Sequence, residues 1–379
     1  MRTAQWTLAP GAPEAAAPPL QQDAHLVLVF GGRADLEDVT AADALRDAYP
    51  EACLVGCATG GEIVGGAVVD GRLAVTAVAF DTVRVSAASV ELRERESAWA
   101  AGQRLGGRLA REHADAGALA HVLLFADGVG LNGSEFVRGL EGALPTGVAV
   151  TGGLAGDADR FERTPLWCGT PLGGPGAVAV GLYGAGLRVG YGAAGGWDPF
   201  GPDRLVSRSD GHVLHALDGQ SALALYRRYL GPHADSLPAS GLRFPLSVHQ
   251  PGSPDVIRTL LATDDAAGTL TFAGDVPEGA SARLMRANPE RLIEGAAQAA
   301  RDALAGLGCD ADLALVVSCV GRKWVLGQRV DEEVEAAADV LGGVAMSGFY
   351  SYGEVSPALP GAPSQLHNQT MTVTLFAEA

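Results

Sequence analysis

One strand–helix–strand unit recurs three times along this sequence, and such a repeat constrains a fold more than any single motif does. In the first copy the strands are at 25–30, 52–57 and 73–80, with a helix at 41–49. In the second copy the strands are at 121–125, 147–151 and 177–183, with a helix at 134–144. In the third copy the strands are at 313–318, 343–346 and 370–376, with a helix at 331–341. Chance alternation in an ordinary α/β protein is the alternative to duplication. The pattern predicts an α/β fold of two related halves, built from repeated strand–helix–strand units with mixed β-sheets.

Connecting segments complete the predicted organisation. A strand and a long amphipathic helix precede the second copy at 83–92 and 97–111, and the third copy at 282–287 and 289–304. The Gly- and Pro-rich stretch 192–202 interrupts the periodicity, as a domain junction does. We therefore predict a flexible N-terminal arm at 1–23, an N-terminal domain at 24–196 and a C-terminal domain at 197–379.

Composition excludes several classes of function. Hydrophobic residues make up 47% of the chain and the net charge is −17, so we expect a globular protein that repels nucleic acid and anionic membrane surfaces. The sequence has neither an apolar run long enough to span a membrane nor a signal peptide at its start, which predicts a cytoplasmic protein. The 5 cysteines are scattered without a Cys-x-x-Cys pair, which argues against a disulfide framework or a zinc site.

Glycine-rich turns follow the second strand of each copy. Each turn ends near an acidic residue, namely Glu62, Asp157 or Glu354. Backbone N–H groups of such turns can converge on a ligand, whereas simple turn geometry explains part of the glycines. None of the turns matches a nucleotide-binding fingerprint. The candidate ligand-binding residues here are Thr59, Glu62, Gly153 and Asp157.

A second group of candidates lies near the C-terminus. Arg322 follows an apolar strand, where its guanidinium suits bidentate capture of a carboxylate, although a structural ion pair is the alternative. Glu354 can accept an ammonium group between aromatic walls, and a packed turn is the alternative there. The remaining candidates of this region are Ser318, Cys319, Phe349, Tyr350, Tyr352, Gly353, His367 and Asn368.

Two side chains also allow other chemistry. Cys319, beside Arg322, is either a buried thiol or a nucleophile with a lowered pKa. His367 or His249 is either a hydrogen-bonding group or an axial haem ligand. No catalytic triad, metalloprotease or calcium-loop motif accompanies them, so we expect no catalytic residues, no metal site and no cofactor, with haem as the alternative.

The sequence resembles the FIST family over residues 24–379. The strings that carry the resemblance are 55–63, 125–128, 151–157, 217–231, 274–279, 318–322, 348–354 and 367–370. The resemblance implies a standalone bacterial sensor of signal transduction, whose proposed ligands are amino acids or related metabolites. Some family members resemble haem-bound nitric oxide sensors. We expect a non-enzymatic protein that signals in trans to a histidine kinase or a diguanylate cyclase.

Overall fold

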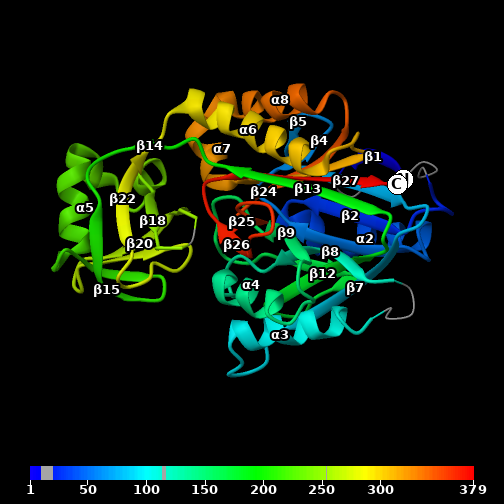
Figure 1. Cartoon of the computed structure of the whole chain (residues 1–379), viewed down its shortest axis with the longest axis horizontal. Helices are drawn as coiled ribbons and strands as arrows, with labels where there is room; N and C mark the ends of the chain where they lie inside the picture. The colour runs from blue at the N-terminus through cyan, green and yellow to red at the C-terminus, as the bar shows by residue number, and fades with distance from the viewer. Residues whose placement is uncertain (10–19, 113–116, 253) are drawn as a thin grey trace.

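The computed structural model describes residues 1–9, 20–112, 117–252 and 254–379. Within these residues, three six-stranded sheets form a body, and a fourth, nine-stranded sheet forms a separate lobe at the left of Figure 1. The lobe comprises residues 198–286, and the body comprises the other described residues. No helix in the described part of the chain is long and apolar enough to cross a membrane.

The three sheets of the body share one strand order. Each runs from a connector strand through a closing strand, a first strand and a second strand to a two-stranded arm. The first sheet contains β1 (Arg2–Leu8), β6 (Leu73–Ala79), β2 (Leu26–Gly31), β3 (Cys53–Ala58), β10 (Leu166–Cys168) and β11 (Thr170–Pro171). The second contains β7 (Arg84–Glu91), β12 (Gly176–Tyr183), β8 (Leu119–Ala126), β9 (Ala149–Leu154), β25 (Gly353–Pro357) and β26 (Ser364–His367). The third contains β13 (Leu187–Ala194), β27 (Met371–Glu378), β23 (Leu313–Cys319), β24 (Ala345–Ser351), β4 (Glu62–Val64) and β5 (Ala67–Val69).

Pairing within the sheets confirms the predicted mixed α/β class. In every copy the first and second strands are parallel, while the closing strand is antiparallel to the first. A parallel pair needs a crossover, and the helices α2 (Val39–Ala48), α4 (Gly133–Glu141) and α8 (Val330–Leu341) provide it. The short helices α1 (Arg33–Glu37) and α7 (Val320–Leu326) also lie in these crossovers, as does the 3₁₀ helix η3 (Gly327–Arg329).

Each arm completes the sheet of another copy. The arm strand β10 leaves the second copy and pairs with β3 of the first. Likewise, β25 of the third copy pairs with β9 of the second, and β4 of the first pairs with β24 of the third. No body sheet is therefore built from one copy alone.

A ring of three backbone hydrogen bonds closes this exchange, at the point where the second strands end. Gly60 N donates to Tyr350 O at 2.7 Å, Gly156 N donates to Ala58 O at 2.8 Å, and Tyr352 N donates to Leu154 O at 3.1 Å. The three donors occupy equivalent positions in the three copies, and so do the three acceptors. The glycine-rich ends of the second strands thus meet in pairs at the centre of the body.

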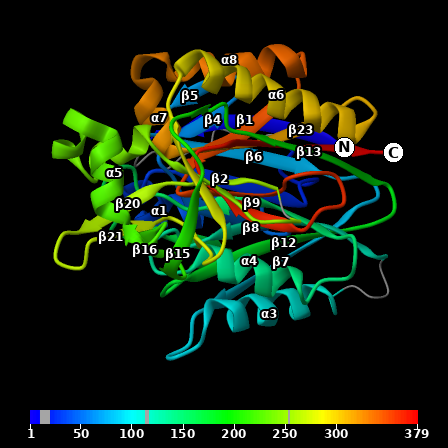
Figure 2. The same ribbon diagram turned by 60° about the vertical axis from the view of Figure 1, so that its left-hand side comes forward.

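Helices cover the outer faces of the sheets. Helix α3 (Ala98–Leu109) packs on α4, and α6 (Pro289–Leu307) packs on α8 and on the strands β13 and β27. Figure 2 shows these two helix pairs on opposite sides of the stacked sheets. Small and apolar side chains at helical spacing form the buried stripe of α6: Leu292, Ala296, Ala299, Ala300, Ala303 and Leu307.

The lobe is an insertion between the connector strand β13 and helix α6. Its strands are β14 (Asp198–Pro199), β15 (Arg204–Asp210), β16 (Val213–Leu217), β17 (Gln220–Ser221), β18 (Leu246–His249), β19 (Val256–Arg258), β20 (Leu260–Asp264), β21 (Thr269–Phe272) and β22 (Ser281–Arg286). Its helices are α5 (Ala222–Leu230) and the 3₁₀ helices η1 (Gly231–Ser236) and η2 (Ala239–Arg243). An apolar core of its own, which includes Val206, Leu223 and Phe272, holds the lobe together.

Several predicted boundaries need correction. The strand predicted at 282–287 as the third connector is β22 of the lobe, whereas β13 pairs with β27 as β7 pairs with β12. The predicted arm at 1–23 begins with strand β1, which pairs with β6; residues 10–19 lie outside the described residues. The second strands also continue into the predicted turns, because β9 ends at Leu154 and β24 ends at Ser351. The division at 196 and 197 stays a prediction, although the body sheets combine strands from both sides of it.

Glycine on the second strands lets them approach the first strands closely. A Cβ atom on Gly152 would lie 2.0 Å from Leu124 O, and one on Gly348 would lie 1.9 Å from Val316 O. We expect Gly152→Ala and Gly348→Ala each to lower the free energy of unfolding by about 1–3 kcal/mol, measured by urea unfolding. Gly306→Ala in helix α6 is the control, because its Cβ would meet only ordinary contacts with Gly190 and Tyr191 of β13. If both strand variants unfold at the same urea concentration as the wild-type protein, this packing is contradicted.

Candidate functional site

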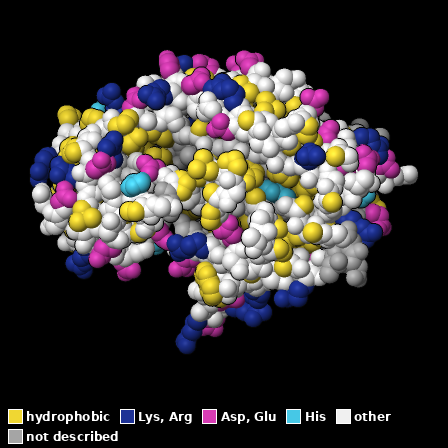
Figure 3. Space-filling model, viewed as in Figure 1, with side chains coloured by type: hydrophobic (Ala, Val, Ile, Leu, Met, Phe, Trp, Pro, Cys, Tyr) yellow, Lys and Arg dark blue, Asp and Glu magenta, His cyan; other side chains and the backbone are white. Residues whose placement is uncertain are grey.

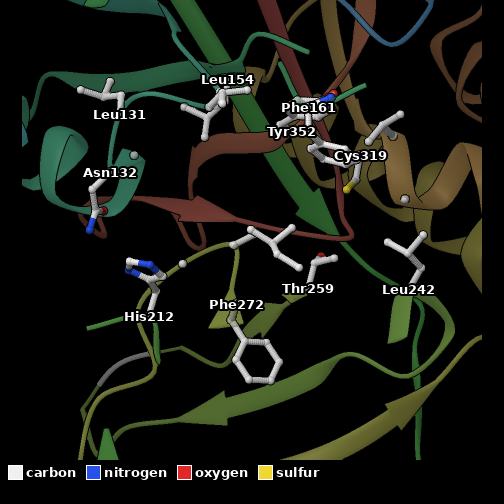
Figure 4. A pocket seen from close by; sticks show the side chains of 18 of the residues that line it. Leu131, Asn132, Leu154, Phe161, His212, Leu242, Thr259, Phe272, Cys319 and Tyr352 are labelled. Carbon is white, nitrogen blue, oxygen red and sulfur yellow. The ribbon is translucent and has the colours of Figure 1, made fainter. Parts of the chain in front are cut away.

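A cavity of about 330 Å³ lies between the lobe and the body. Figure 3 shows the surface hollowed between these two parts, with hydrophobic side chains beside the hollow. The body contributes Gly128, Val129, Gly130, Leu131, Asn132, Gly133, Leu154, Phe161, Cys319, Val320, Gly321, Trp324 and Tyr352. The lobe contributes His212, Leu242, Thr259, Leu261, Phe272, Ala273 and Gly274. In Figure 4, Leu154, Tyr352 and Cys319 lie across the cavity from Thr259 and Phe272.

An aromatic wall forms the body side of the cavity. Tyr352, whose backbone belongs to the ring of three hydrogen bonds, stacks on Phe161 with ring centroids 4.5 Å apart. Trp324 packs edge-on against Phe161 at 6.0 Å. The Tyr352 hydroxyl donates to Asp157 Oδ1 and to Ala158 O, the latter at 2.9 Å. The orientation of the wall is therefore fixed by hydrogen bonds behind it.

Asp157 holds the loop that carries Phe161. Its carboxylate accepts hydrogen bonds from the backbone N–H groups of Phe161, Glu162 and Arg163 at 2.9, 3.0 and 3.1 Å. Burial opposes ionisation, but the hydrogen bonds from Tyr352 and from these backbone groups hold the pKa of Asp157 below its usual value. The predicted residue Asp157 thus shapes the cavity without lining it.

A tight loop between β8 and α4 forms another part of the wall. Asp127 Oδ1 accepts hydrogen bonds from Val129 N at 2.8 Å and Gly130 N at 2.6 Å. The Asn132 side chain caps helix α4 by accepting from Glu135 N at 3.1 Å. Glycine is required at 128, where a Cβ would lie 2.0 Å from Ala155 O. Residues 125–128 are among the strings that carry the family resemblance, but no residue of this loop is among the predicted ligand-binding residues, although its closely spaced glycines after a strand were an available signal.

The cavity lining is uncharged. Among the residues that the structure describes, no Asp, Glu, Lys or Arg lines it, in a chain whose net charge is −17. Thr259 contributes a buried hydroxyl to the lining: the residue is 5% exposed, and its Oγ1 has no hydrogen-bond partner within the described structure. A mostly apolar hollow with a few polar groups is typical of small-molecule sites.

Arg322 does not face the cavity, which corrects the expectation that it captures a ligand carboxylate. The side chain is fully buried in helix α7, and Nε and Nη2 lie 2.9 and 2.8 Å from Glu333 Oε2. Nη1 and Nη2 donate to the backbone oxygens of Gly195 and Leu292 at 2.5 and 2.7 Å. Every nitrogen of the guanidinium is therefore engaged within the protein, as in the structural alternative.

The carboxylates predicted to meet a ligand are also buried beside partners of their own. Glu354 accepts from Ser351 Oγ at 2.7 Å and from Thr370 N and Oγ1 at 3.1 and 2.8 Å. Glu62 accepts from the Thr59 hydroxyl. Burial raises the pKa of Glu354 to about 7 and that of Glu62 to about 8. Neither carboxylate lines the cavity.

The other predicted residues divide between cavity and core. Tyr352 and Cys319 line the cavity. Tyr350 and Ser318 donate from the core to Glu333 Oε1 at 2.9 and 3.1 Å. The remainder are buried away from the lining. Phe349 packs against Phe30, Gly153 pairs with Glu354 and Gly353 pairs with Leu154 between strands β9 and β25, and the fully buried Asn368 lies close to Gly353.

The haem and nucleophile alternatives do not fit this geometry. The buried His367 has Nε2 2.9 Å from Ser356 O, and burial lowers the pKa of His367 to about 4. His249 is exposed on the lobe beside Asp255. Neither histidine lines the cavity, and the described residues hold no cluster of three metal-binding side chains. Burial raises the pKa of the Cys319 thiol, helped by Glu354, which disfavours a nucleophilic thiolate.

Replacing Arg322 tests its structural role. In Arg322→Met, Glu333 stays buried without its cationic partner, so we expect the free energy of unfolding to fall by about 3–5 kcal/mol in urea unfolding. The matched control is Arg301→Met, which removes an exposed ion pair with Glu294 and costs less than about 1 kcal/mol. Equal stability of the two variants would contradict the structural assignment of Arg322.

Comparison with known proteins agrees with the resemblance seen in the sequence. Residues 25–220 match the FIST N domain and residues 222–357 match the FIST C domain. The uncharacterized protein MT0656 of Mycobacterium tuberculosis (strain CDC 1551 / Oshkosh) is 27% identical over 265 residues, 68% of each chain. The uncharacterized protein Mb0898c of Mycobacterium bovis (strain ATCC BAA-935 / AF2122/97) is 28% identical over 241 residues, 61% of each chain.

Two solved structures are similar over almost the whole chain. A chorismatase has a TM-score of 0.38 at 12% identity and covers 99% of this chain and 98% of its own. A cyanuric acid hydrolase from A. caulinodans has a TM-score of 0.40 at 12% identity and covers 100% of this chain and 99% of its own. At these values neither similarity bears on activity. The two domain matches together span most of the sequence, and the chain therefore belongs to the FIST family of signal-transduction sensors.

Proposed function

We propose that this protein is a non-catalytic sensor that binds a small organic ligand in the cavity between the lobe and the body. The observation that carries the proposal is the lining itself, which combines loops of the body with strand ends of the lobe around an apolar hollow. A ligand held there contacts both parts, so its binding free energy favours one arrangement of the lobe over others. Such a shift is the property that a sensor needs.

Few polar contacts set the position of the lobe on the body. Arg138 Nη2 lies 3.1 Å from Asp275 Oδ2, and Arg258 Nη1 donates to Leu366 O at 3.1 Å. Beside the cavity, Gln369 Nε2 of the body donates to the backbone oxygen of Leu242 of the lobe at 3.3 Å. These contacts flank the cavity, because Gly274 lines it and directly precedes Asp275. A bound ligand would add to this small set of contacts, which supports a link between occupancy and lobe position.

The chemical class of the ligand is also a matter of proposal. The family resemblance predicts an amino-acid-like metabolite, and binding of an amino acid is one outcome of the test below. A non-enzymatic role is supported by the lining, which has no charged acid–base pair among the described residues, and by the buried, protonated state favoured for Cys319. We place the protein in the cytoplasm, as its sequence predicts.

A thermal-shift screen with a cavity-blocking variant tests the site. We expect a ligand at 100 times its Kd to add about 2.7 kcal/mol of stability to the wild-type protein. Ala273→Phe fills the cavity from a half-buried position directly after β21, and we expect the shift to disappear. Ala262→Phe adds the same ring to an exposed position of β20 and serves as the control. The site assignment is wrong if ligands stabilise the blocked variant as much as the control.

We further propose that the signal passes to a separate histidine kinase or diguanylate cyclase, as the resemblance implies. With the ligand from the screen, the activity of the purified partner should change when the wild-type sensor is added. The change should be absent with Ala273→Phe and retained with Ala262→Phe. If the activity of the partner is the same with and without the sensor and the ligand, that class of partner is excluded.

A further inference from the structure

The chemistry of the cavity lining narrows the class of ligand. No charged side chain of the described residues lines it, and two charged residues beside the lining, Asp127 and Arg258, form hydrogen bonds within the protein. Asp127 accepts hydrogen bonds from the loop that it supports. Arg258 lies behind Gly274, with Nε donating to Asp275 O at 2.9 Å and Nη1 donating to the backbone oxygens of Ile257 and Leu366 at 3.2 and 3.1 Å. Neither group offers a counter-charge to a molecule in the cavity.

A charged ligand would lose its hydration in this site without gaining an ion pair. Buried ions persist in proteins where an opposite charge and further hydrogen bonds compensate for the lost water. The ammonium and carboxylate of a free amino acid would meet only uncharged groups among the described lining residues. An uncharged molecule avoids this cost, so the lining selects against zwitterions.

Aromatic rings line the cavity mainly on its body side. The stacked pair Tyr352 and Phe161, with Trp324 beside them, lies across from the His212 imidazole of the lobe, whereas the Phe272 ring points into the lobe core. Aromatic surfaces favour offset-stacked and edge-to-face contacts with another ring. A volume of about 330 Å³ is at the small end of ligand sites, which fits a molecule of one or two rings.

Thr259 supplies one specific polar contact. Its hydroxyl is buried on the lobe side of the cavity and has no hydrogen-bond partner in the described structure. Figure 4 shows Thr259 across the cavity from Tyr352 and Cys319. A buried hydroxyl without a hydrogen bond is unfavourable, and a ligand group that pairs with it removes this penalty. The site therefore offers a buried hydroxyl that a ligand can pair with.

We propose that the cavity between the lobe and the body binds an uncharged aromatic molecule of one or two rings, which forms a hydrogen bond with Thr259. This inference rests on the proposed function, because it assumes that the cavity is the ligand site. It differs from the amino-acid-like ligand that the family resemblance predicts, since a free amino acid carries two charges at neutral pH.

Pairs of small molecules that share a ring and differ in charge show how each of these features affects the affinity of the cavity. We expect p-cresol and indole to bind the full-length protein in calorimetric titrations at pH 7. Tyrosine and tryptophan carry the same rings with two added charges, and we expect them to bind at least ~10-fold more weakly, a difference of about 1.4 kcal/mol. Tyramine and 4-hydroxyphenylacetate, with one charge each, should be weakened in the same direction.

Substitution of Thr259 tests the hydrogen bond. Thr259→Val keeps the shape of the side chain and removes its hydroxyl, so the affinity for p-cresol should fall by up to ~10-fold while that for toluene stays unchanged. Thr263→Val, on the half-buried part of β20 outside the lining, should leave both affinities unchanged. Equal effects of Thr259→Val on p-cresol and toluene would exclude the proposed contact.

The outcomes distinguish this inference from the proposed function. Tighter binding of p-cresol and indole, lost in Ala273→Phe, supports both. Amino acids that bind as tightly as the uncharged rings, again lost in Ala273→Phe, overturn the inference and leave the cavity as the ligand site. The inference also fails if no ring compound binds while another metabolite does so in a cavity-dependent way. Binding that survives in Ala273→Phe overturns the proposed function as well.

Discussion

The ring of three backbone hydrogen bonds at the centre of the body is the constraint on which the rest of the structure depends. Each bond joins the end of one copy's second strand to the turn of another copy, between residues as far apart as Gly60 and Tyr350. Because every arm also completes a neighbouring sheet, the three copies can reach this arrangement only together. The ring fixes the backbone of Tyr352, and through it the aromatic wall of the cavity.

Buried polar groups near this centre hold the architecture rather than a ligand. The Glu333 carboxylate on α8 accepts hydrogen bonds from Arg322 of α7, Tyr350 of β24 and Ser318 of β23. Arg322 also donates a hydrogen bond to the backbone oxygen of Gly195, in the segment that leads to the lobe. This network joins the third copy to the start of the lobe. The groups that remain for a ligand are those at the edge of the body, where the inserted lobe covers the ends of β8 and β23.

The sequence predicts the periodic parts of this fold well and the non-local parts poorly. Apolar strand and helix patterns located the three copies, because those patterns reflect burial along a single segment. Strand β22 was mistaken for a connector, since a half-buried strand has the same alternation in the lobe as in the body. Arg322 was expected at an open strand end, but helix α7 starts at Val320 and turns the side chain inward. The lobe side of the cavity, including Thr259, has no local signal, because tertiary packing alone brings it to Tyr352.

A crystal structure with a ligand from the thermal-shift screen tests the central claim most directly. The claim is that the inserted lobe and the end of the third copy enclose the ligand between them. The structure should show the ligand between the Tyr352 and Phe161 rings on one side and Thr259 and His212 on the other. A ligand bound on another face, with the space between lobe and body empty, would contradict this account.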